Sequence, residues 1–360
     1  MPRVTDLGIR VGLLPAGATD SVLDVPGVGL GHATVWRDEP PPPAGRGVAR
    51  TGVTVLDPGG DLFSSPVPAG GAVLNGAGEC TGMLTMREWG LLESPVFLTS
   101  TMQVGRVYDA ACELLMAEQP AIGTEDVLIP VVAECDDSFL NDARRMQIGP
   151  GDVRAALTAA RESVGAPAVP EGAVGAGTGM SCLGYKGGIG TASRVLPSGP
   201  TVGVVTLTNF GVRERLTVAG VPVGRLLPEP GPGQPAAPPA GSCIVAVITD
   251  GPLDTASCAR VARRAGLGLA RTGSTGHHGS GEIFLALATG LRAPRGQAAA
   301  RPPVTGSALD DYFDAATEAT EEAVINSMLQ AETVTGRDGN TSYQLPAADV
   351  RRLVTDRAGR

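Results

Sequence analysis

The sequence predicts an α/β protein, and two patterns that alternate over the whole chain support this fold class. Short apolar runs rich in valine and isoleucine are typical of buried strands. They lie at residues 52–56, 95–99, 127–132, 202–208 and 244–249. Amphipathic helical patterns lie among and after them, at residues 104–117, 152–163, 254–271 and 309–329. Because no shift in charge divides the 360 residues, we expect a single domain, 1–360.

Glycine, proline and capping residues mark the expected ends of two of these helices. Gly105 and Arg106 open the first helical pattern, and Pro120 follows its end. Asp254 precedes the third helix just after Pro252, and an aspartate at this place accepts hydrogen bonds from the free N–H groups of the first turn. The third helix is therefore expected to begin directly after Asp254.

Composition and charge exclude several classes of protein. With 42% hydrophobic residues the chain has ample material for a core, so global disorder is excluded. The formal charge is −9 and the arginines are scattered, so we expect no nucleic-acid partner. No apolar run is long enough to span a membrane, and no signal sequence opens the chain, so we expect a cytoplasmic protein without a membrane partner.

The six cysteines and three histidines show no metal-binding spacing. We therefore expect free, buried thiols, no metal ion and no cofactor. The cysteines are Cys80, Cys112, Cys135, Cys182, Cys243 and Cys258.

Two segments are dense in glycine or proline. Residues 171–193 are rich in glycine, and such small residues allow close approach of backbone to backbone or to a ligand. Its Gly179 to Gly184 spacing matches part of a phosphate loop, but Tyr185 stands where lysine is required, which argues against nucleotide binding. The only lysine, Lys186, is expected to be a cation within this tightly packed segment, with a structural ion pair as the alternative. Residues 227–241 are rich in proline, so we expect an exposed, semi-extended loop.

The proline-rich loop ends at Gly241, and an apolar strand begins at Ser242. Cleavage between these two residues would give Ser242 a free α-amine held at the start of a buried strand. An α-amine titrates near about 7.7–8.0, so it can act as the base for its own hydroxyl. The alternative is an ordinary turn before a strand.

Nine segments in one order carry a resemblance to a known family. They are DVPGVGLGHATV (24–35), PVPAGGAVLNGAGECTG (66–82), VGRVYDA (104–110), VVAECDDSFLND (131–142), GAVGAGTGMSCLGYKGGIGTASR (172–194), TLTNFG (206–211), GSCIVAVITDGPL (241–253), GSGEIFLALAT (279–289) and ATEEAVINSMLQAET (319–333). The chain resembles the L-aminopeptidase D-alanine esterase/amidases and β-peptidyl aminopeptidases, which are self-processing N-terminal-nucleophile serine hydrolases. The resemblance implies a four-layer αββα sandwich, cleavage into residues 1–241 and 242–360, and homo-oligomers of these processed heterodimers.

The resemblance also implies roles for individual residues. Ser242 would be the nucleophile and Asn209 a donor to the oxyanion. Ser280 and Glu282 would hydrogen-bond near the amine of Ser242. The substrate is then a short peptide, amide or ester with a free N-terminal amine.

The carboxylate of Glu134, just after the strand expected at residues 127–132, would receive that amine by the same resemblance. It can reject N-blocked substrates because it would be left unpaired. Asp136 would also lie in the substrate site. The family carries a tyrosine at this position, so we expect altered turnover or substrate range.

Each assignment has an alternative on the residues alone. Asn209 could form a turn before Phe210, Glu134 could be a surface acid, and Glu282 a solvated loop acid. His277 and His278 allow a serine–histidine hydrolase, although no nucleophile-elbow motif surrounds Ser280. An idle binding or scaffold protein and an acyltransferase of the ornithine acetyltransferase kind are the other possibilities; the latter use threonine at the junction.

Overall fold

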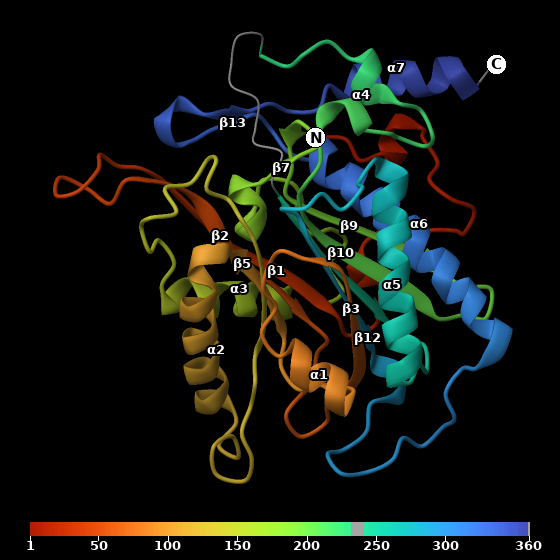
Figure 1. The fold of residues 1–360 in the computed structure, drawn as a ribbon. Coiled ribbons are helices and arrows are strands. Elements are labelled where there is room, and N and C mark those ends of the chain that lie inside the picture. The colour runs from red at the N-terminus through yellow and green to blue at the C-terminus, as the bar shows by residue number, and fades with distance from the viewer. Residues whose placement is uncertain (232–240, 359–360) are drawn as a thin grey trace.

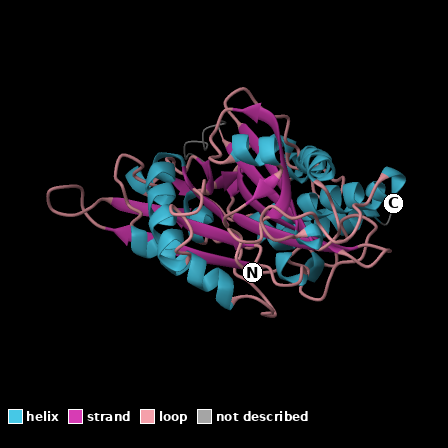
Figure 2. Ribbon diagram, turned by 90° about the horizontal axis from the view of Figure 1, so that it is seen from below, coloured by secondary structure: helices cyan, strands magenta, loops and turns pink. Residues whose placement is uncertain are grey.

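Two β-sheets stack face to face, and helices cover both outer faces (Figure 1). The computed structural model describes residues 1–231 and 241–358. The exposed loop predicted for residues 227–241 lies for the most part outside these ranges. Viewed from below, the strands form the interior of the molecule and the helices flank them (Figure 2).

The first sheet has four strands and belongs to the N-terminal part of the chain. In spatial order they are β1 (Gly29–Asp38), β2 (Val48–Asp57), β5 (Val96–Ser100) and β6 (Val131–Cys135). Neighbours are antiparallel except β5 and β6, which run parallel. Helices α2 (Val104–Glu118) and α3 (Pro150–Glu162) pack on its outer face.

The second sheet has six strands drawn from the middle and end of the chain. In spatial order they are β4 (Leu91–Leu92), β3 (Val67–Gly76), β12 (Gly281–Ala288), β11 (Ser242–Thr249), β10 (Thr201–Asn209) and β9 (Ile189–Val195). Only β11 and β12 run parallel to each other. Helices α5 (Thr255–Thr272) and α6 (Asp310–Leu329) cover its outer face.

Alternation along the strands explains why the layers stack. Side chains of a strand point to its two faces in turn. In β11, Ile244 and Ala246 lie in the core between the sheets, whereas Val245 and Val247 lie in the core beneath α5 and α6. Because both faces are buried, the strand is apolar throughout, as its sequence suggests. The four-layer αββα arrangement is thus confirmed.

Smaller elements complete the described fold. They are α1 (Met83–Trp89), α4 (Val223–Leu226), α7 (Ala347–Ala358) and two short hairpins, β7 (Ser181–Cys182) with β8 (Tyr185–Lys186) and β13 (Val334–Thr335) with β14 (Thr341–Ser342). None of the helices in residues 1–231 and 241–358 has the length and apolar character needed to cross a bilayer.

Most predicted elements are confirmed, with two kinds of exception. All four helices form within about two residues of their expected ends, and the Asp254 side chain accepts from the Ser257 N–H at 2.8 Å as a helix cap. The strand expected at residues 127–132 was placed too early, because β6 begins only at Val131, after Pro130, which has no N–H to donate. Strands β1, β3 and β9 were not predicted.

The cysteines are free thiols in the structure. Five of the six are buried, as expected, and burial raises the pKa of each buried thiol. Cys112 is the exception, since it is partly exposed on α2.

Candidate active site

Ser242 stands at the start of β11 between two strands. On one side it pairs with Asn209, the last residue of β10, and on the other with Gly281, the first residue of β12. Ser242 is 5% exposed and Asn209 is 7% exposed. Alternation places both side chains on the face of the sheet that carries Ile244 and Leu207, toward the first sheet. A buried hydroxyl and a buried amide therefore share one end of the space between the sheets.

The Asn209 amide is held at both ends. Its Oδ1 accepts from the Ser181 N–H at 2.9 Å, and its Nδ2 donates to the Asp136 carbonyl oxygen at 2.7 Å. A primary amide carries two hydrogens on nitrogen, so one hydrogen remains for a further acceptor. The turn-forming alternative does not describe this residue, whose amide has a fixed orientation next to Ser242.

Gly241 fits its place only because it has no side chain. A Cβ at this position would lie 1.6 Å from the Asn209 carbonyl oxygen, far inside any van der Waals contact. The Gly241 carbonyl oxygen accepts a hydrogen bond from the Gly281 N–H at 3.1 Å. The peptide bond that precedes Ser242 is thus held tightly, and its carbonyl group is polarised by a backbone donor.

Ser280 and Glu282 flank Gly281 and contact each other. The Ser280 hydroxyl donates to Oε1 of Glu282. Glu282 is fully buried, and its Oε2 has no hydrogen-bond partner among the described residues. Burial raises the pKa of Glu282, and the Ser280 hydrogen bond opposes that rise. The solvated loop acid expected as an alternative is wrong, because this carboxylate is fully enclosed.

The carboxylate of Glu282 lies on the opposite face of the sheet from the Ser242 hydroxyl. Glu282 pairs with Cys243, whose side chain belongs to the core beneath α5 and α6. The main chain at the start of β11 lies between the two faces. The sheet therefore separates the Glu282 carboxylate from the Ser242 hydroxyl.

Asn75 holds the turn that carries Ser280, a role that the sequence did not reveal. Its Nδ2 donates to the carbonyl oxygens of His277 and His278 at 3.1 Å each, and also to that of Ser280. The Ser280 hydroxyl is directed to Glu282 and makes no hydrogen bond to a histidine ring within the described chain. The serine–histidine alternative therefore has no contact to support it.

Glu134 lies at the end of β6 and is 2% exposed. Its Oε1 accepts from the Glu79 N–H at 2.9 Å, and its Oε2 accepts from the Thr101 hydroxyl. A Cβ on Gly78 would be 3.0 Å from Oε1 and 3.7 Å from the Cα of Gly281, so the carboxylate lies close to the strand beside Ser242. Glu134 is therefore a buried acid of the site, not a surface acid.

Burial raises the pKa of Glu134, and the two hydrogen bonds oppose this effect. The negative charges of Asp136 and Glu79 raise it further. Neither Glu134 nor Asp136 has an ion-pair partner in residues 1–231 and 241–358. A cationic ligand group would find no competing cation there.

The backbone and the side chain of Asp136 have different surroundings at the site. Its backbone carbonyl contacts the Asn209 amide, as described above, while its side chain is exposed and accepts from the Ser138 N–H at 2.8 Å. The residue therefore contributes a backbone acceptor to the site and a negative charge at its rim.

The structure thus brings all seven predicted site residues to one end of the two sheets. At this end β6 and β10 terminate, and β11 and β12 begin. The seven residues are Glu134, Asp136, Asn209, Gly241, Ser242, Ser280 and Glu282. Sequence reasoning missed Asn75 and Thr101, which hold two of them. Asn75 lies within one of the segments that carried the resemblance, whereas nothing in the sequence marks Thr101.

Comparisons with known proteins show the family to which the chain belongs. The model of peptidase family S58 matches residues 20–342. The β-peptidyl aminopeptidase BapA of Sphingosinicella microcystinivorans is 39% identical, over 98% of this chain and 92% of its own. Two solved structures superpose over 99% of both chains: a β-aminopeptidase from Burkholderia sp., with a TM-score of 0.88 and 40% identity, and an L-aminopeptidase D-Ala-esterase/amidase from Ochrobactrum anthropi, with 0.89 and 34%. The latter is described as a prototype of the serine aminopeptidases and a variant of the Ntn hydrolase fold. The chain belongs to peptidase family S58.

Proposed function

We propose that this chain is a self-processing serine aminopeptidase. It is cut between Gly241 and Ser242, and Ser242 then hydrolyses short peptides, amides or esters that carry a free N-terminal amine. The observation that carries this proposal is the position of Ser242, buried at the first residue of a central strand and opposite the amide of Asn209. The relatives named as aminopeptidases and amidases support the substrate class.

Self-cleavage begins with attack of the Ser242 hydroxyl on the carbonyl carbon of Gly241. The C–N bond breaks, the nitrogen takes up a proton to become the α-amine of Ser242, and an ester links the two pieces. Water then hydrolyses the ester and leaves a carboxylate on Gly241. The Gly281 N–H already bonds the reacting carbonyl oxygen and would stabilise its developing charge.

Turnover reuses the same hydroxyl with the new α-amine as base. The amine accepts the hydroxyl proton while the oxygen attacks the substrate carbonyl, and the leaving amine departs with a proton. Water releases the acyl group from Ser242 in the second half. The free hydrogen of the Asn209 amide is available to the oxyanion, and one such donor contributes about 3–4 kcal/mol to transition-state stabilisation.

Ser280 and Glu282 serve the amine and not the hydroxyl. Cleavage places a new amino group at the start of β11, beside the buried carboxylate whose Oε2 has no partner within the described chain. Because an anion favours the protonated form of a nearby amine, the carboxylate acts as an acceptor that orients the amine and does not lower its pKa.

Glu134 receives the amine of the substrate. Its carboxylate is buried, anchored by Glu79 and Thr101, and free of cations, so a substrate ammonium supplies its missing counter-charge. An N-acetylated substrate brings no positive charge and leaves the carboxylate unpaired and desolvated. Asp136 adds a second negative charge at the rim.

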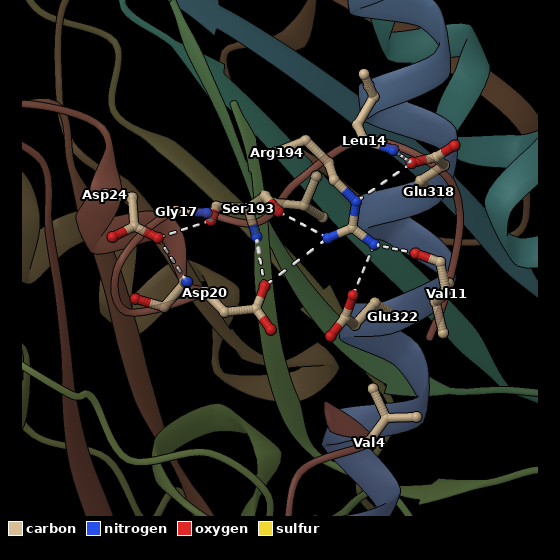
Figure 3. Close-up of polar contacts among 12 residues, drawn as sticks. Val4, Val11, Leu14, Gly17, Asp20, Asp24, Ser193, Arg194, Glu318 and Glu322 are labelled. Atoms are coloured by element: carbon tan, nitrogen blue, oxygen red, sulfur yellow. Dashed lines mark hydrogen bonds and ion pairs between the residues drawn. The ribbon is translucent and has the colours of Figure 1, made fainter. Parts of the chain in front are cut away.

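A buried ion cluster joins the two pieces (Figure 3). Arg194, which is 1% exposed, pairs with Glu322 at 2.6 Å and Glu318 at 3.3 Å on α6. It also donates to the carbonyl oxygen of Val11 at 2.7 Å, and Glu318 accepts from the Leu14 N–H at 3.0 Å. The contacts of Glu318 and Glu322 cross from residues 1–241 to residues 242–360, whereas the bond between Arg194 and Val11 lies within residues 1–241. Assembly of such processed heterodimers into homo-oligomers stays a prediction.

A pair of substrates tests the proposal. The purified protein should hydrolyse an amino-acid p-nitroanilide with a free amine, and the N-acetylated compound should react at least about tenfold more slowly. Glu134→Gln should reduce this ratio, because glutamine carries no charge for the ammonium. Equal hydrolysis of both compounds by the wild-type protein would contradict the substrate assignment.

A further inference from the structure

Lys186 is a buried cation that the proposed chemistry does not use. It lies on β8, is fully buried, and its Nζ donates to three backbone carbonyl oxygens: those of Gly177 at 3.0 Å, Met180 at 2.7 Å and Gly187 at 2.7 Å. No carboxylate lies within ion-pair distance of it in the described ranges, so the structural ion pair left open by the sequence is not formed there. The ammonium instead ties together the turns on both sides of the β7–β8 hairpin.

This hairpin leads directly to one end of the Asn209 amide. Ser181 follows Met180 in the chain, and its N–H donates to Oδ1 of Asn209. Met180 is held by the ammonium and also accepts from the Gly187 N–H at 3.1 Å. The position of the Ser181 N–H is thus set by the contacts of Lys186.

A second buried charge stands at the other end of the amide. Asp136, whose carbonyl oxygen accepts from Nδ2 of Asn209, is followed by Asp137, which is fully buried. Oδ1 of Asp137 accepts from the Ser100 hydroxyl at 2.8 Å and from Nδ2 of Asn141 at 3.0 Å. These bonds fix the Asp136 carbonyl oxygen in the same way that Lys186 fixes the Ser181 N–H.

The two anchors meet at Gly179. A Cβ there would lie 2.7 Å from the Cβ of Asp137, so the Asp137 side chain packs directly on the turn that Lys186 holds. Opposite charges attract each other through a dry interior even beyond ion-pair distance. Burial lowers the pKa of Lys186 to about 7, and the negative charge of Asp137 opposes this lowering. Burial raises the pKa of Asp137 to about 6.

We propose that Lys186 and Asp137 are positioning residues that together set the direction of the Asn209 amide. Neither touches the substrate. Each holds one backbone group that binds the amide, so that the remaining Nδ2 hydrogen points at the developing oxyanion. The inference rests on the role proposed for Asn209. Because a misdirected donor is lost in the transition state and not in substrate binding, the expected effect falls on kcat and not on KM.

A double-mutant cycle tests the coupling. Lys186→Met should lower kcat by at least about tenfold with KM changed less than about twofold. The same substitution in an Asn209→Ala background should lower kcat no further, since no amide is left to position. Asp137→Ala, which removes the Oδ1 acceptor that binds Ser100 and Asn141, should behave in the same way. An equal loss of kcat in both backgrounds would overturn the inference.

Two further measurements separate this role from a general loss of stability. Arg194→Met removes a buried cation of similar kind far from Ser242, and it should lower the melting temperature while kcat of the folded protein is retained. If Lys186→Met does not fold, the double-mutant cycle of Asp137→Ala with Asn209→Ala provides the test of the positioning role on its own. If Asn209→Ala leaves kcat unchanged, the oxyanion role itself is wrong and the positioning role falls with it. If the wild-type protein hydrolyses no amide, the proposed function is what fails.

Discussion

Ser242 and Asn209 pair directly across the end of the second sheet, one as the first residue of β11 and the other as the last residue of β10. Both side chains are directed toward the first sheet by the alternation of their strands. A nucleophile and an oxyanion donor are thereby held in register by backbone pairing, which is more rigid than placement on a loop.

Gly241→Ala should slow self-cleavage strongly. A methyl group at this position would overlap the Asn209 carbonyl oxygen, so the ends of β10 and β11 must move apart. We expect at least about a tenfold slower appearance of the two pieces on denaturing gels, because small displacements of reacting groups have large kinetic effects. Gly105→Ala is the matched control, since a Cβ there meets no atom within 4 Å. Cleavage of Gly241→Ala at the wild-type rate would show that the close approach is unimportant.

Binding of an amine inhibitor at Glu134 should weaken at acidic pH. Burial and nearby negative charges hold the pKa of Glu134 above its ordinary value. As pH falls through that pKa, the carboxylate takes up a proton and loses its attraction for an ammonium. The Ki of a competitive amine inhibitor should therefore rise.

Asp136→Asn should move this rise in Ki to lower pH. The substitution removes one of the charges that raise the pKa of Glu134. Glu125→Gln, which alters an exposed carboxylate on the loop after α2, should leave the profile unchanged. A Ki that does not vary with pH, or a pH profile of Ki that Asp136→Asn leaves unchanged, would contradict the amine-binding role of Glu134.

Arg194→Met should destabilise the protein by about 3–5 kcal/mol, because it leaves the carboxylates of Glu318 and Glu322 buried without their cation. Thermal unfolding at one protein concentration measures the effect. Arg271→Met is the control: this half-exposed residue pairs with Glu321 at 3.4 Å, and such pairs contribute less than about 1 kcal/mol. Equal stability of the two variants would exclude a structural role for the ion cluster between the pieces.

Strong local patterns made part of the fold predictable. The run from Ser242 to Thr249 is apolar on both faces, and Asp254 caps the helix that follows, so both elements could be recognised without any tertiary information. In strands β1, β3 and β9 glycine and alanine interrupt the apolar residues, so no continuous apolar run marks them. Glycine is needed there because other backbone segments approach closely: a Cβ on Gly190 of β9 would lie 1.8 Å from the Ala323 carbonyl oxygen of α6.

The residues of the candidate site were predictable only where their motifs resemble those of the family. Ser242, Asn209 and Glu134 could be named from their motifs, but their contacts join segments far apart in the chain. That Lys186 binds three carbonyl oxygens and no carboxylate depends on how the glycine-rich turns pack, which no spacing encodes. Asn75 and Thr101 likewise act through tertiary contacts alone.

The central claim is that Ser242 cuts the chain before itself, and an intact-mass measurement under denaturing conditions tests it most directly. Wild-type protein should give two species, residues 1–241 and 242–360, the smaller one beginning with Ser242. Ser242→Ala should give a single species of 360 residues with no amidase activity. A wild-type chain that stays at full length after prolonged incubation, or an active Ser242→Ala protein, would contradict the claim.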